Sequence, residues 1–126
     1  MGAVGAGAAL SFRQTLERHL DAIARRDLPA LADTVAPESL VLITAEGKLV
    51  RGTREFLEMH RAWFASPGWT LEVAPEEIYE GPELGVAVLR LLYQEPGVRA
   101  ASLLTLVFRR IGGKWLMVQD QNTPIK

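Results

Sequence analysis

Two successive strand-like segments, residues 85–94 and 98–110, are apolar on both faces, and this pattern constrains the fold more than any other feature. Alternate residues of a strand point to opposite faces. The first segment carries Ala87, Leu89, Leu91 and Tyr93 on one face, and Val86, Val88, Arg90 and Leu92 on the other. The second segment, which includes Leu104, Leu106 and Phe108, repeats the pattern. A sheet with one face in water would alternate apolar and polar residues, so we expect both faces to be covered.

The rest of the chain can cover only one of these two faces. Three helical segments are expected before the long strands, and they supply cover for one side. No further sequence remains for the other side, and large apolar surface patches usually mark an interface. We therefore expect a homodimer that forms through the sheet face. The alternative is a strongly curved sheet that buries its second face on itself.

The three helices have start signals in the sequence. Ser11 and Gln14 form a capping box, which predicts a helix from residue 11 to about residue 26 with apolar residues at helical spacing. Asp27 is a capping residue for a short second helix that reaches Val35. Thr53 is expected to cap a third helix that ends near residues 66–68.

The other segments are typical of strands. A hairpin is expected over residues 40–51, followed by strands at 69–80, 85–94, 98–110 and 115–122. Short turns rich in Gly and Pro join the long strands and favour antiparallel pairing. Pro75 lacks the N–H that a central strand needs, so the strand that contains it should lie at a sheet edge. Helices gathered on one face of a mostly antiparallel sheet make an α+β domain.

Length and composition limit the possible functions. The chain has 126 residues, a net charge of −1 and no cysteine. We expect one domain over residues 10–126 after a flexible leader at residues 1–9, located in the cytoplasm. The near-neutral charge argues against nucleic acid or a membrane as partner. Without cysteine, and with two distant histidines, neither a metal nor a cofactor is expected.

Two motifs resemble a known family. The last strand, GKWLMVQDQNT at residues 113–123, and the entry to the third helix, GTREF at residues 52–56, are similar to the SnoaL-like branch of the nuclear-transport-factor-2-like superfamily. With the order of elements, the resemblance covers about residues 10–124. It implies three helices on a curved sheet that encloses a conical pocket, in a cystatin-like topology. Gln119 and Gln121 depart from the family, whose members often have histidine there.

The resemblance also implies which side chains face the pocket. In the related calcium/calmodulin-dependent kinase II association domain, a similar strand carries a pocket arginine at the position of Arg90, and the position of Asn122 faces the pocket. Alternation along the last strand then places Asp120, Val118 and Leu116 on the same face as Asn122.

Asp120 is the principal candidate for catalysis. A carboxyl group surrounded by apolar side chains has a raised pKa, which suits a general base or acid. SnoaL-like cyclases use a late acidic residue in this way. Alternatively, Arg90 pairs with Asp120 and keeps it ionised, as a structural ion pair or an anion clamp. A solvated Asp120 without a function is the third interpretation.

His60 and its aromatic neighbours are the other candidates. His60 is either an acid–base group or a histidine at the edge of the core that donates to a backbone carbonyl. Phe56, Trp63, Phe64 and Leu106 are expected to contact a ligand, although such residues often belong only to the core. His19 is expected near the exposed face of the first helix.

Three functions remain possible from the sequence. The first is a homodimeric domain that binds a small apolar or weakly anionic organic ligand in an apolar cone. The second is an enzyme of the isomerase, cyclase or hydratase type with Asp120 as general base, assisted by His60 or Arg90. The third is an oligomerisation module similar to the kinase association domain.

Overall fold

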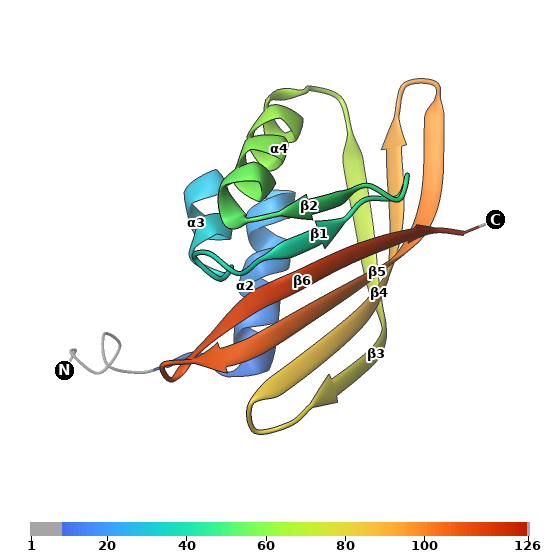
Figure 1. The fold of residues 1–126 in the computed structure, drawn as a ribbon. Helices are drawn as coiled ribbons and strands as arrows, with labels where there is room; N and C mark the ends of the chain where they lie inside the picture. Colours follow the sequence, from blue (N-terminus) through green and yellow to red (C-terminus); the bar gives the residue numbers. More distant parts are fainter. Residues whose placement is uncertain (1–8, 126) are drawn as a thin grey trace.

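The computed structural model describes residues 9–125, and within them three helices pack on a six-stranded sheet (Figure 1). The helices are α2 (Phe12–Ala24), α3 (Leu28–Ala32) and α4 (Thr53–Ala65). The strands are β1 (Val41–Ile43), β2 (Leu49–Arg51), β3 (Thr70–Glu80), β4 (Leu84–Glu95), β5 (Val98–Ile111) and β6 (Lys114–Pro124). The predicted α+β class and the predicted order of elements are confirmed. Most of the expected leader, residues 1–8, lies outside the described residues.

The sheet has the order β2-β1-β6-β5-β4-β3. All neighbouring strands are antiparallel except β1 and β6, which run parallel and bring the short hairpin beside the last strand. Strand β3 lies at an edge, as Pro75 predicts, and its pairing with β4 shifts register between Pro75 and Glu77. In Figure 1 the long strands curve around the helices, which all lie on one side of the sheet.

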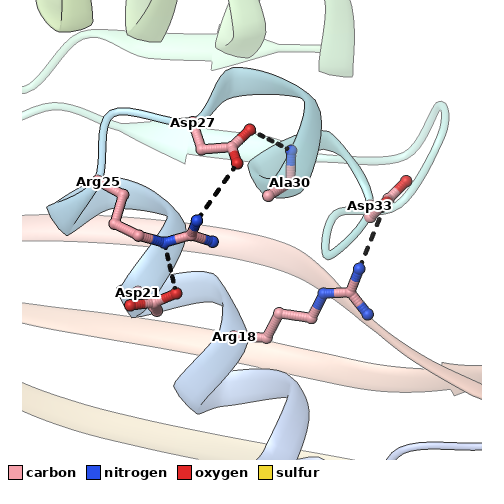
Figure 2. Close-up of polar contacts among 6 residues, drawn as sticks. All are labelled: Arg18, Asp21, Arg25, Asp27, Ala30 and Asp33. Atoms are coloured by element: carbon pink, nitrogen blue, oxygen red, sulfur yellow. Dashed lines mark hydrogen bonds and ion pairs between the residues drawn. The ribbon is translucent and has the colours of Figure 1, made fainter.

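Local hydrogen bonds explain where the first two helices begin. The capping box of α2 is present, because Ser11 accepts from the Gln14 amide and Gln14 accepts from the Ser11 amide. Asp27 caps α3 by accepting from the Ala30 amide at 3.0 Å, and Arg25 bridges Asp27 and Asp21 (Figure 2). Helix α3 ends at Ala32, so the prediction that it reaches Val35 is wrong.

The expected cap of α4 is wrong. Thr53 is already the first helical residue, and the capping position is Gly52, whose φ of 95° suits glycine. The Thr53 hydroxyl donates to the carbonyl oxygen of Ala36 instead. This bond ties the start of α4 to the loop that precedes β1, so it helps to hold the helix over the hairpin.

The core lies between the helices and the concave face of the sheet. Alternate residues of β4 and β5 point into it, and they include Ala87, Leu89, Leu104, Leu106 and Phe108, all buried. The opposite face carries Val86, Val88, Leu92, Leu103 and Val107, which are half-buried in the single chain. The helices therefore cover one apolar face of the sheet, as predicted, and the described residues leave the other partly exposed.

A bulge in β6 changes the predicted alternation of that strand. Val107 of β5 pairs with Gln119, but the next residue, Phe108, pairs with Met117, so Val118 is an additional residue in β6. Met117 shares the core-facing side with Phe108 and is fully buried, and Leu116 pairs with the exposed Arg109. Regular alternation stops at this bulge, so the expectation that Val118 and Leu116 lie on the same face as Asp120 is wrong.

None of the helices in residues 9–125 combines the length and the apolar character needed to span a membrane.

Candidate functional site

A cavity of about 450 Å³ lies between α4, the β1–β2 hairpin and β6. Helix α4 contributes Met59, His60 and Trp63, and strand β6 contributes Asp120 and Asn122. The hairpin supplies the rest of the wall, from residue 42 and residues 44–46. The volume lies in the range of sites for small organic molecules, about 300–1,000 Å³.

The fold brings together residues that are 60 positions apart in the chain. The parallel pairing of β1 with β6 sets Leu42 beside Asp120. Asp120 and Asn122 are two positions apart on one strand, so both point to the same side, and the Asn122 amide donates to Asp120 Oδ1 at 3.3 Å. His60 and Trp63 are one turn apart on α4, so they also share a side.

Asp120 is a buried carboxyl group, with 5% of its surface exposed. Its partner across the sheet is Leu106, which is fully buried. Within residues 9–125, no lysine or arginine forms an ion pair with Asp120. Burial therefore raises the pKa of Asp120 to about 7, because the charged form loses its hydration without gaining a cation.

Near neutral pH His60 is an uncharged imidazole, and a backbone hydrogen bond fixes the position of its proton. Its Nδ1 lies 2.8 Å from the carbonyl oxygen of Phe56. A carbonyl oxygen only accepts, so Nδ1 carries the proton and Nε2 keeps its lone pair. Burial lowers the pKa of His60, and the hydrogen bond to Phe56 opposes this shift in part. The interpretation of His60 as a donor to a backbone carbonyl is confirmed, and because His60 also lines the cavity, its acid–base role stays a prediction.

Asp120 and His60 give the cavity a donor and an acceptor without a net charge. Below pH 7 the carboxyl group mostly retains its proton and can donate it. Nε2 of His60 can accept wherever the imidazole is uncharged, a form that burial favours. A ligand group that both accepts and donates, such as a hydroxyl group, matches this pair. Glu46 is the acidic residue of the hairpin part of the wall, and it disfavours anionic ligands.

Comparisons with known proteins identify the family. The model of the SnoaL-like domain family matches residues 12–123. The chain belongs to this family. No curated protein matches the sequence of this chain.

Solved structures share the fold of this SnoaL-like domain. A candidate calcium/calmodulin-dependent protein kinase type II association domain from Thiobacillus denitrificans aligns with a TM-score of 0.82 and 18% identity, over 94% of this chain and 98% of that one. A ketosteroid isomerase-like protein from Erwinia carotovora atroseptica aligns at 0.74 and 16%, over 90% and 93%. An NTF-2-like protein of unknown function from Shewanella oneidensis aligns at 0.74 and 23%, over 88% and 94%. The predicted nuclear-transport-factor-2-like, cystatin-like fold is confirmed.

The SnoaL-like domain brings four of the predicted site residues to the cavity: His60, Trp63, Asp120 and Asn122. The other predicted aromatic and aliphatic residues do not line the cavity; they are Phe56, Phe64 and Leu106. Phe56 is fully buried and packs on His60, with ring centres 4.0 Å apart. Phe64 is half-buried beside Trp63, with ring centres 5.7 Å apart.

Arg90 does not face the cavity, and its predicted place beside Asp120 is wrong. The neighbouring residues Leu89 and Leu91 point into the core, so alternation directs Arg90 to the opposite face. There its Nε donates to Glu76 Oε2 at 2.8 Å, and half of its side chain is exposed. The ion-pair interpretation of Asp120 fails for this reason.

His19 is also placed differently from the prediction, because it is buried. Its position continues the buried stripe of α2, three residues after Leu16 and four before Ile23. The Thr34 hydroxyl donates to the Leu31 carbonyl, so it accepts from His19 Nδ1 at 2.8 Å. Burial, with a smaller contribution from His60, lowers the pKa of His19 to about 3.

Sequence reasoning missed the hairpin part of the wall and Met59. The sequence offers one signal for Met59, because it directly precedes the predicted site residue His60 on the same helix. The sequence offers no signal for Leu42, Thr44 and Glu46, because the hairpin lines the cavity only through its parallel pairing with β6. Within residues 9–125, no three His, Asp or Glu side chains cluster as a metal site requires.

A second cavity of about 410 Å³ lies beside the start of α2 and the β5–β6 turn. Its charged wall residues are Arg18, Asp33 and Lys114, and Trp115 is its aromatic one. Arg18 and Asp33 pair with each other at 3.6 Å, and both are largely exposed (Figure 2). None of the residues predicted to form a site lines this second cavity.

Proposed function

We propose that this SnoaL-like domain binds a small, uncharged, largely apolar organic molecule in the cavity between α4, the hairpin and β6. The observation that carries the proposal is that the buried carboxyl group of Asp120 and the half-buried imidazole of His60 line one cavity, whose apolar wall residues are Leu42, Ala45, Met59 and Trp63. A pocket with few polar groups orients a ligand through them and gains affinity from its apolar walls. The apolar option of the predicted ligand class is favoured over the anionic one, because Arg90 lies elsewhere and Glu46 lines the cavity.

Binding of 2-naphthol tests this proposal. Its flat apolar rings match the apolar wall, and its hydroxyl group can accept from Asp120 and donate to His60. We expect saturable binding by isothermal titration calorimetry at pH 6, and weaker binding of 2-methoxynaphthalene, which cannot donate. Met59→Trp should block the cavity, because Met59 lines it from an exposed helix position, and Met59→Leu is the matched control. Binding that Met59→Trp leaves unchanged would contradict the proposal.

A second candidate function is acid–base catalysis at a carbon atom, in the manner of an isomerase, cyclase or hydratase. It is favoured by the pKa of Asp120, which burial raises to about 7, where a carboxylate is both available and basic near neutral pH. The carboxylate would remove a proton from the carbon beside a ketone, the electron pair would move onto the ketone oxygen, and the proton would return from Asp120 to carbon.

Deuterium uptake from D₂O into 2-tetralone, followed by NMR, tests the catalytic candidate. We expect the protein-dependent rate to rise with pH through about 7 as the carboxylate forms. Asp120→Asn should remove this rate while 2-naphthol still binds. A rate that is the same in Asp120→Asn and in the unchanged protein would exclude Asp120 as the base.

The homodimer remains part of the proposal. It is supported by the outer sheet face, where Val86, Val88 and Leu103 are half-buried in the single chain, and by the position of all three helices on the other side (Figure 1). Light scattering should give the mass of a dimer, whereas a larger ring would favour the oligomerisation module. Val88→Arg should give a monomer, and Val98→Arg, at the β4–β5 turn, is the control. The predicted cytoplasmic location remains a prediction that cell fractionation can test.

A further inference from the structure

The indole of Trp63 is held from behind by a second indole. The rings of Trp63 and Trp69 are stacked, with centres 4.2 Å apart and planes 17° apart. Trp69 is 3% exposed and does not line the cavity, whereas Trp63 does. The Trp69 Nε1–H also donates to the backbone carbonyl of Trp63 at 3.0 Å. Trp69 therefore fixes both the ring and the backbone of a residue in the cavity wall.

Arg26 holds Trp69 in the same manner. The guanidinium carbon lies 3.8 Å from the centre of the Trp69 ring, and Nη2 donates to the Trp69 carbonyl at 2.6 Å. Arg26 lies just beyond α2 and is the one described residue other than glycine with a positive φ, at 56°. That conformation is uncommon for a side chain of this size, and here it accompanies a guanidinium group stacked on an aromatic face.

We propose that Arg26 and Trp69 are positioning residues for the ligand cavity. The contacts from Arg26 to Trp69 and from Trp69 to Trp63 hold the Trp63 indole in place as a flat, preformed part of the wall. Such a wall suits a ligand with a planar unsaturated ring. The inference rests on the proposed function, and it adds the shape of the ligand and two residues outside the cavity. A preformed wall favours binding because a side chain that is already ordered loses little further freedom when the ligand enters.

Three variants separate this role from a general effect on folding. Arg26→Ala removes the guanidinium group, and Arg26→Gly also removes it while suiting the positive φ, so it should fold without backbone strain. Arg25→Ala is the matched control. The neighbouring Arg25 pairs with Asp21 and Asp27 (Figure 2), whereas the cation–π contact in residues 9–125 belongs to Arg26.

The test compares a flat and a puckered ligand. We expect Arg26→Ala and Arg26→Gly to weaken 2-naphthol binding about three- to tenfold, while decahydro-2-naphthol, which has no planar ring, changes little. Arg25→Ala should leave both affinities unchanged. Equal losses for both ligands, or no loss in either Arg26 variant, would overturn the inference.

A measurement without ligand separates this inference from the proposed function. Stacked indoles give a coupled band in the circular dichroism spectrum, and Trp115 does not contribute to the pair because it packs on Phe12. The band should weaken in both Arg26 variants and persist in Arg25→Ala. If 2-naphthol does not bind the unchanged protein, the proposed function fails. A weaker band in the Arg26 variants would then still show that Arg26 positions the indoles of Trp69 and Trp63. An unchanged band in the Arg26 variants overturns that role whether or not the ligand binds.

Discussion

Replacing Asp120 with asparagine should stabilise the protein more and more as the pH rises. In the unfolded chain the carboxyl group has a pKa of 3.8, and in the folded protein burial raises this pKa to about 7. Between these two pH values the unfolded state releases a proton that the folded state retains. The stability of the unchanged protein therefore falls with rising pH in this window. An asparagine amide has no proton to lose in this range, so the Asp120→Asn variant lacks this fall.

The size of the effect follows from the same two pKa values. Each tenfold difference in proton affinity between the folded and unfolded states is worth about 1.4 kcal/mol. The difference between 3.8 and about 7 therefore corresponds to a loss of about 4 kcal/mol that is complete above the folded pKa. Such a loss is a large share of the 5–15 kcal/mol, roughly, that stabilises a typical domain.

Urea unfolding between pH 4 and pH 8.5 measures the effect as the difference in unfolding free energy between Asp120→Asn and the unchanged protein. Other titrating groups contribute equally to both proteins, so they cancel in this difference. The Asn122 side chain can still donate to the new amide oxygen. Asp33→Asn is the matched control, because Asp33 is an exposed partner of Arg18, and such pairs contribute only about 0–1 kcal/mol.

A difference that stays flat from pH 4 to pH 8 would refute this reasoning. Such a result would mean that Asp120 ionises as easily in the folded protein as in the unfolded chain, which requires water or a cation beside the carboxylate. The catalytic candidate would then lose its support as well, because it depends on the same raised pKa.

Two further substitutions test the packing around the site. Gly85→Ala should cost about 1–3 kcal/mol of stability, since a Cβ there would lie 2.7 Å from ring atoms of the fully buried Phe12; an unchanged thermal midpoint would show that this ring can move aside. Thr34→Val should cost about 1–3 kcal/mol in urea unfolding because it leaves the buried His19 Nδ1–H without an acceptor, whereas Thr34→Ser keeps the hydroxyl group and should cost less; equal losses would contradict this explanation.

Strand periodicity and turn residues were sufficient to predict most of the fold. The alternation in residues 85–94 identified two apolar faces, and Pro75 identified the edge strand. The same alternation could not decide which face the helices cover, because both faces are apolar. The resemblance places Arg90 in the pocket, whereas in the structure Leu89 and Leu91 are the residues that point into the core.

The candidate site was predictable in its residue types but not in its geometry. Asp120 and Asn122 lie on one face of a strand, and His60 and Trp63 lie on one side of a helix, so each pair is visible in the sequence. Their meeting depends on the parallel pairing of β1 with β6, a long-range contact without a local signal. The bulge at Val118 likewise has no local signal, because neither glycine nor proline lies within residues 116–120.

The position of bound 2-naphthol tests the central claim most directly. Intermolecular nuclear Overhauser effects can be measured between the ligand protons and the aromatic side chains of the labelled protein at pH 6. We predict contacts with the rings of Trp63 and His60, which line the 450 Å³ cavity. Contacts with Trp115, which lines the second cavity, or no saturable contacts at all, would contradict the claim.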